Sequence, residues 1–114
     1  MPSILLAYDR FEEPRPFRLD WVIDTEAVQP QIIDLLECHA TQVFEWLPSL
    51  IPGQDGPYDT AWLTSFYQRK PAAIAKKARA LTTARVDLRF AEAFEVSDYG
   101  GPFDARRHPF LPSA

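Results

Sequence analysis

Two histidines and one cysteine are the residues of this chain with the widest catalytic uses. Cys38 and His39 are neighbours on a predicted helix, about 100° apart around its axis, so they do not naturally chelate one ion or form a nucleophile and base pair. A hydrolytic zinc site needs three protein ligands, and neither Asp34 nor Glu37 has the three- or four-residue spacing that would stack it on His39. We therefore expect no complete catalytic centre, no metal ligand and no cofactor-binding residue within this chain.

His39 lies within the apolar stripe of that helix and has two interpretations. In the first, it is a core residue whose ring nitrogens are satisfied by the backbone or by Thr41 or Gln42. In the second, it lines or braces a pocket, with Thr41 and Gln42 as supporting residues. The other histidine, His108, falls in a proline-rich tail, where we expect it to be solvated.

Hydrophobic periodicity predicts the elements that position these residues. The short apolar run Ile4–Ala7 is typical of a buried strand, which needs neighbours on both sides. Apolar residues at three- and four-residue spacing from Val28 to Leu47 predict one amphipathic helix that ends before Pro48. The whole pattern predicts strands over residues 3–8, 19–24 and 86–96, a helix from Thr25 or Pro30 to Leu47, a helix over 59–81 with a kink or interruption at Pro71, and an extended tail over 99–114.

The composition excludes some classes of partner. With a formal net charge of -4, the chain lacks the excess of Lys and Arg by which proteins neutralise phosphates, so we expect no nucleic-acid partner. The basic residues between Arg69 and Arg85 are interpreted as a solvated helix face. No apolar run approaches the roughly 20 residues that span a bilayer, so we expect no membrane partner. A single cysteine suits a reducing cytoplasm, which is the expected location.

Three segments, in order along the chain, carry a resemblance to a known family. The run Asp34–Pro48 contains Cys-His-Ala-Thr-Gln followed by Glu-Trp-Leu-Pro. The flanking segments are Pro16–Arg18 leading into Trp21–Asp24, and Phe90–Gly100. Together they resemble the C-terminal part of the PIG-L, or LmbE-like, zinc-dependent N-deacetylases. The resemblance implies an α/β, Rossmann-like enzyme in which zinc-bound water hydrolyses an N-acetyl amide, often on an N-acetylglucosamine moiety.

The same resemblance implies that the chain is incomplete. The family's metal-binding and general-base residues lie in an early Ala-His-Pro-Asp-Asp-Glu motif and a later His-Pro-x-His segment, and neither occurs here. Thr41 stands where the family usually has Ser, a change that retains the hydroxyl. We expect residues 1–98 to be the C-terminal half of the domain, without its N-terminal strands and metal-site loops. Zinc and an N-acetylated sugar-type substrate are then expected only when an N-terminal segment or a complementary chain completes the enzyme.

A second hypothesis is that the chain is a non-catalytic interaction module, or a gene remnant, that self-associates through exposed apolar surface. Hydrophobic faces that lack a partner within the chain commonly mark such contacts. This hypothesis predicts a defined homo-oligomer without any added segment. The half-enzyme hypothesis instead predicts a chain that is inactive alone.

Overall fold

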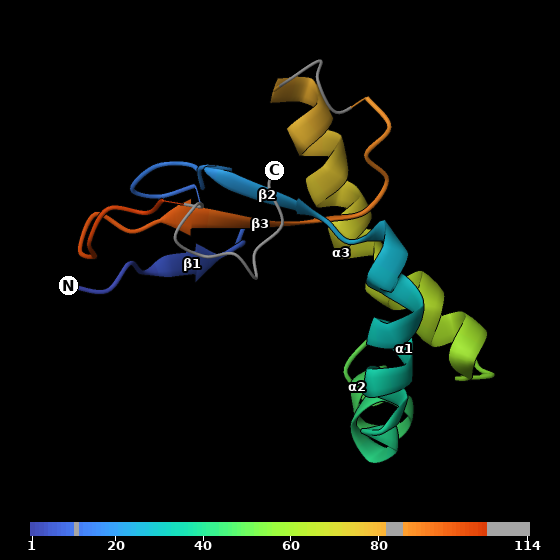
Figure 1. Ribbon diagram of the computed structural model, residues 1–114. Helices are drawn as coiled ribbons and strands as arrows, with labels where there is room; N and C mark the ends of the chain where they lie inside the picture. Colours follow the sequence, from blue (N-terminus) through green and yellow to red (C-terminus); the bar gives the residue numbers. More distant parts are fainter. Residues whose placement is uncertain (11, 82–85, 105–114) are drawn as a thin grey trace.

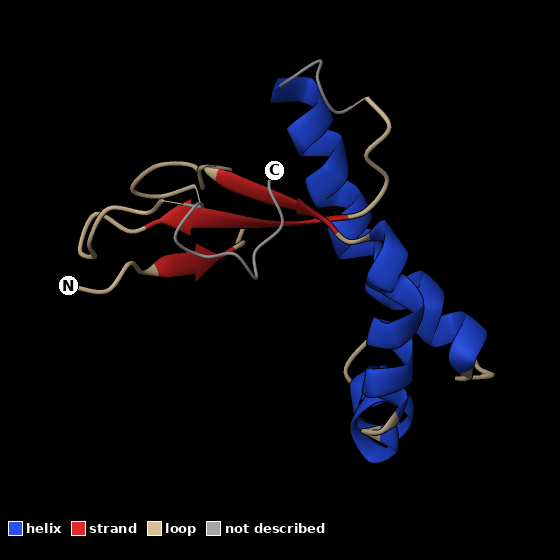
Figure 2. Cartoon of the chain, in the orientation of Figure 1, coloured by secondary structure: helices blue, strands red, loops and turns tan. Residues whose placement is uncertain are grey.

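The chain combines a small antiparallel sheet with a set of helices, a mixed α and β structure (Figures 1 and 2). The computed structural model describes residues 1–10, 12–81 and 86–104. The elements in chain order are β1 (Leu5–Ala7), β2 (Trp21–Asp24), η1 (Glu26–Val28), α1 (Gln29–Glu37), η2 (Thr41–Trp46), α2 (Leu47–Ser49), α3 (Thr60–Leu81) and β3 (Ala91–Val96). Figure 1 shows α3 crossing one end of the sheet and running on to the side of α1 and α2.

The central strand of the sheet is β3, the last strand in the chain. The order is β1-β3-β2, and β3 pairs antiparallel with both neighbours, so that Leu5 lies opposite Val96 and Trp21 opposite Phe94. The expectation of a buried strand with two neighbours near the N-terminus is therefore wrong for the described residues. A strand does form there, but it is an edge strand, and Leu6 is 42% exposed.

One face of the sheet packs against α3. The helix contributes Ile74, Ala75 and Ala78, and the strand contributes the buried Ala91 and Ala93. Small side chains on both elements let the helix backbone approach the sheet closely. The remaining buried members of this cluster are Tyr8 and Leu88. The strand predicted over 86–96 is thus shorter than expected, because β3 begins at Ala91 and Leu88 joins the core from the loop before it.

The opposite face of the sheet is largely apolar but only half-buried. Because paired residues of an antiparallel ladder point to the same side, this face gathers Leu5, Trp21, Ile23, Phe94 and Val96, together with Glu92 opposite Ile23. Phe103 packs edge-on against the Trp21 ring, with centroids 5.3 Å apart. The Trp21 indole N–H is buried and has no hydrogen-bond partner within the described residues. This face is therefore less completely packed than the one beneath α3.

The predicted single helix up to Leu47 is broken into several pieces. α1 ends at Glu37, the π-helical η2 follows a short break, and α2 begins at Leu47. Pro48 does not end the helical region, because it lies at the start of α2, which continues directly from η2. Despite these breaks, α1 and η2 still pack apolar side chains against α3. That second cluster is built from Ile33, Val43 and Leu63, with half-buried Leu36, Phe44, Trp62 and Tyr67 around it.

The sequence predicts a kink or an interruption at Pro71, and α3 continues through this residue without interruption. Pro71 is buried, and its ring occupies interior volume while its missing N–H removes one helical hydrogen bond. Leu63 before it and Ile74 after it belong to different core clusters. α3 is therefore the element that joins the sheet layer to the helical region. No helix of the described residues has both the length and the apolar character needed to cross a bilayer.

The start of the expected tail packs against the N-terminal segment. The Gly101 N–H donates to the Pro2 carbonyl at 2.8 Å, and the Ser3 hydroxyl donates to the Pro102 carbonyl at 2.8 Å. A Cβ on Gly101 would lie 2.5 Å from the Met1 carbonyl oxygen, so the close approach of these two segments requires glycine. The remainder of the expected tail, including His108, lies outside the described residues.

Candidate functional site

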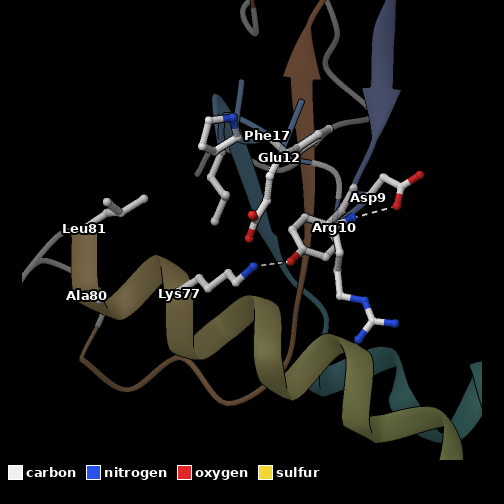
Figure 3. Close-up of a pocket in the computed structure, with 10 residues that line it drawn as sticks. Asp9, Arg10, Glu12, Phe17, Lys77, Ala80 and Leu81 are labelled. Atoms are coloured by element: carbon white, nitrogen blue, oxygen red, sulfur yellow. Dashed lines mark hydrogen bonds between the residues drawn. The ribbon is translucent and has the colours of Figure 1, made fainter. Parts of the chain in front are cut away.

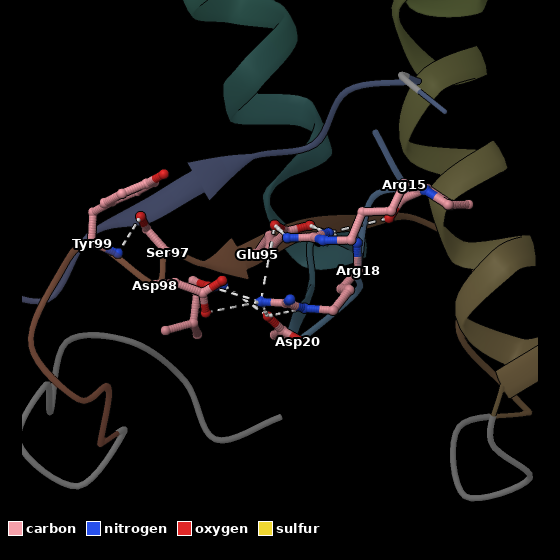
Figure 4. A network of polar contacts seen from close by, with 9 residues as sticks. Arg15, Arg18, Asp20, Glu95, Ser97, Asp98 and Tyr99 are labelled. Carbon is pink, nitrogen blue, oxygen red and sulfur yellow. Dashed lines mark hydrogen bonds and ion pairs between the residues drawn. The ribbon is translucent and has the colours of Figure 1, made fainter. Parts of the chain in front are cut away.

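A buried carboxylate, Glu95, forms the centre of the best-connected polar cluster (Figure 4). It lies on β3 with only 2% of its surface exposed, on the same face as the core alanines. Arg15 donates to both of its oxygens, at 2.5 and 2.9 Å, and the backbone N–H of Arg18 donates at 2.8 Å. Two parallel guanidinium bonds and one amide bond compensate the desolvation of this charge.

These contacts determine the ionisation state of Glu95. The hydrogen bonds from Arg15, followed by the one from the Arg18 backbone, lower the pKa of the Glu95 carboxyl from 4.5 to about 2. At neutral pH the group is an ionised acceptor whose two oxygens already have donors. A general base needs a pKa nearer the working pH and a free oxygen, so Glu95 is suited to holding the fold together rather than to moving protons.

The Arg18 side chain extends the same cluster towards solvent. It lies 3.3 Å from an Asp20 oxygen and 3.9 Å from an Asp98 oxygen, and it donates to the Val96 carbonyl at 3.1 Å. Asp20 also accepts the Val96 N–H at 2.9 Å. The side chains of Arg18 and Asp20 thereby attach the segment before β2 to the backbone of Val96 at the end of β3. Sequence reasoning missed this cluster, although the alternation of β3 places Glu95 on the same face as the buried alanines.

The residues chosen from the sequence lie elsewhere, on the surface of the broken helix. His39, Thr41 and Gln42 are all exposed, so the interpretation of His39 as a core residue is wrong for the described chain. The backbone of His39 makes hydrogen bonds: its N–H donates to the Leu36 carbonyl, and its carbonyl accepts from the Gln42 N–H, each at 2.9 Å. The three side chains follow one another along η2 and its preceding break. They do not line either of the two principal pockets.

Both pockets lie between α3 and the segment that follows β1. The first has a volume of about 380 Å³, and Lys77 projects into it from α3 opposite Phe17 and Glu12 (Figure 3). The Lys77 ammonium donates to the Tyr8 hydroxyl. The second pocket, of about 540 Å³, shares Tyr8 and its two following residues with the first and continues along α3 towards Phe66.

The described side chains supply ion pairs and pockets, but no cluster of metal-ligating groups. Within residues 1–10, 12–81 and 86–104, no three His, Cys, Asp or Glu side chains are grouped so that they could hold a metal ion. Cys38 is exposed, and its thiol lies 3.5 Å from the Asp34 carbonyl oxygen of its own helix. Comparison with protein-family models, curated proteins and solved structures finds no match for this chain.

Proposed function

We propose that residues 1–98 form the C-terminal half of a PIG-L-like N-deacetylase domain, whose complete form is Rossmann-like and cytoplasmic. In this proposal the chain supplies part of the sheet and its covering helices. A second segment supplies the residues that bind zinc and activate water. The substrate of the complete enzyme is an N-acetylated sugar-type amide.

The observation that carries this proposal is the contact between two separate segments of the resemblance. Pro16–Arg18 and Phe90–Gly100 are far apart in sequence, yet the buried Glu95 of the second accepts the Arg18 N–H of the first at 2.8 Å. Trp21–Asp24, which continues the first segment, pairs with β3 along its length. A buried charge that requires both segments gives a physical reason for them to occur together, which supports reading them as one motif.

The third segment of the resemblance supports the same proposal through its exposed side. Leu35 is 67% exposed and Trp46 is 56% exposed, with His39 and Gln42 on the surface between them. Large apolar side chains exposed on both α1 and η2 offer contact surface for another element. The half-buried face of the sheet is a second such surface. We assign both to contacts with the segment that completes the domain.

The described residues do not fit zinc on their own. A catalytic zinc site takes three protein ligands and an open position, and the described chain offers no such group. The contribution of this chain to the reaction is therefore to position the domain and to form part of the substrate wall. His39, Thr41 and Gln42 are the side chains we propose for that wall, because all three are exposed on the described helical region.

The test is to measure zinc binding and amide hydrolysis by the 114-residue chain alone. Calorimetric titration with zinc is expected to show no tight equimolar site, and incubation with N-acetylglucosamine derivatives is expected to release no amine above the buffer control. One tightly bound zinc together with amine release from the isolated chain would overturn the proposal.

A second candidate is a self-associating module, which the half-buried sheet face favours. Leu5, Trp21, Phe94 and Val96 form an apolar area to which another copy could add its own. Sedimentation velocity distinguishes the candidates. A single concentration-dependent dimer or higher oligomer would support self-association, and a well-behaved monomer would exclude it.

A further inference from the structure

The second pocket has a charge opposite to that of the whole chain. Its lining includes three cations, Arg10, Arg69 and Lys70, and a single carboxylate, Asp9, whereas the net charge of the chain is -4. An Asp9 oxygen already accepts the Arg10 backbone N–H at 2.6 Å. Within the part of the chain that the structure describes, none of the three cations forms an ion pair. The lining therefore carries an excess of positive charge, with three cations against one carboxylate.

The aromatic rings of Phe66 and Tyr67 line the same pocket, and each contacts a neighbouring residue that holds it in place. Phe66 stacks on Trp62 with centroids 5.2 Å apart and planes 15° apart, and the Trp62 indole donates to Gln54 at 2.9 Å. Burial, followed by the charge of Glu92 and a hydrogen bond to it, raises the pKa of the Tyr67 phenol, which stays neutral at physiological pH. These contacts hold two rings in place in a pocket that exposed cations also line.

We propose that this pocket binds an anionic small molecule that carries a flat ring, of the nucleoside monophosphate class. The phosphate would be held by Arg10, Arg69 and Lys70, since guanidinium groups bind phosphate through paired hydrogen bonds. The ring would lie against Phe66 and Tyr67, which provide stacking surface for any planar heterocycle. A volume of about 540 Å³ is within the usual size of small-molecule sites.

This site does not depend on the deacetylase proposal. It uses no zinc and no acetyl group, and its residues lie on α3 and the segment after β1 rather than on the helical region that carries His39. Success or failure of ligand binding therefore leaves the test of hydrolysis unchanged. The interpretation of Arg69 and Lys70 as merely a solvated face is what the experiment must exclude.

The experiment is a calorimetric titration of the 114-residue chain with adenosine monophosphate, adenosine and inorganic phosphate. Adenosine monophosphate is expected to bind roughly tenfold or more tightly than either fragment, because it engages cations and rings together. The signal of the Trp62 indole N–H in a ¹⁵N-correlated spectrum is expected to shift with the nucleotide. Equal binding of phosphate and adenosine monophosphate, or no binding in any arm, would overturn the proposal.

Variants locate the site. Arg10→Gln, Arg69→Gln and Lys70→Gln are each expected to weaken nucleotide binding by roughly tenfold. Lys76→Gln is the matched control, since Lys76 lies on the same helix, carries the same charge and does not line the pocket. Phe66→Leu is expected to weaken adenosine monophosphate but not inorganic phosphate. An equal loss in Lys76→Gln and Lys70→Gln would show general charge attraction and would contradict a defined site.

Discussion

Glu95 illustrates how one residue can connect distant parts of the chain. A carboxylate in a sheet interior is costly unless donors surround it, and here Arg15 and the Arg18 backbone supply them. Both donors come from the segment before β2, whereas Glu95 is on β3. The stability of the sheet should therefore depend on this charge being present and paired.

Replacing Glu95 with Gln tests that dependence. The substitution keeps the shape but removes the charge and one acceptor, so Arg15 loses the ion pair and one of its two hydrogen bonds, and we expect the melting temperature to fall by roughly 5 to 10 °C. Thermal unfolding followed by circular dichroism measures the change. Asp98→Asn is the matched control, because Asp98 neighbours the same cluster but its side chain is 81% exposed. A similar melting temperature for wild type and Glu95→Gln would contradict the assigned role.

The same carboxylate predicts a dependence of stability on pH. The pKa of Glu95 is about 2 in the folded chain and ordinarily 4.5, so folding favours the ionised carboxylate over the protonated acid. The stabilisation is complete above pH 4.5 and is lost as the pH falls towards 2. Urea unfolding at a series of acidic pH values should show a smaller loss of unfolding free energy in Glu95→Gln than in wild type. Parallel losses in the two proteins would show that other groups cause the acid sensitivity.

The candidate residues were only partly accessible to sequence reasoning. Motif and periodicity arguments directed attention to His39, which the described structure places on the surface. Glu95 was hidden because a Glu within a strand pattern is normally solvent-facing, and its partner Arg15 lies 80 positions away. Arg10 and Lys70 share a pocket only after α3 packs beside the segment following β1. Such long-range juxtapositions leave no local signal.

Among the elements, α3 contributes the largest number of buried side chains. Its residues take part in both core clusters, and Leu63 and Ile74 are almost completely buried on either side of Pro71. The two clusters have no other helix in common. Loss of packing on α3 should therefore destabilise the whole described fold.

Ile74→Ala tests this position of α3. Because Ile74 is 0% exposed and contacts the sheet, its truncation leaves a cavity and is expected to cost about 2–5 kcal/mol of unfolding free energy. Urea denaturation measures the cost. The comparison is Leu81→Ala on the same helix, where the side chain is 73% exposed and the expected change is within about 0.5 kcal/mol. Equal effects of the two substitutions would argue against the described packing.

Strand and helix positions followed from local patterns more reliably than their ends did. Trp21–Asp24 and α3 were anticipated because alternation and capping are local properties. The break after Glu37 was not, because the apolar spacing continues through it. Pro48 was expected to end the helix, but it lies within α2. Strand order also depends on distant partners, which is why β1 was expected in the sheet interior and lies at its edge.

At the scale of the whole molecule, apolar surface remains on two sides of the described structure. One is the sheet face around Trp21 and Phe94, and the other is the helical side that includes Leu35 and Trp46. The first packs the Phe103 ring and is otherwise half-buried. Under the proposed function a completing segment covers both surfaces, so the two should become protected together when that segment binds.

Complementation tests most directly whether residues 1–98 are the C-terminal half of a deacetylase domain. The chain is mixed with a separately produced N-terminal segment of a PIG-L-like deacetylase that carries the Ala-His-Pro-Asp-Asp-Glu motif, and amine release from an N-acetylglucosamine derivative is followed with zinc present. We predict hydrolysis only in the mixture, with strong loss in Trp46→Ser and little change in the control Val86→Ser, whose side chain is exposed outside the helical region. A mixture that forms a complex but releases no amine, or activity that is insensitive to Trp46→Ser, would contradict the proposed half-domain.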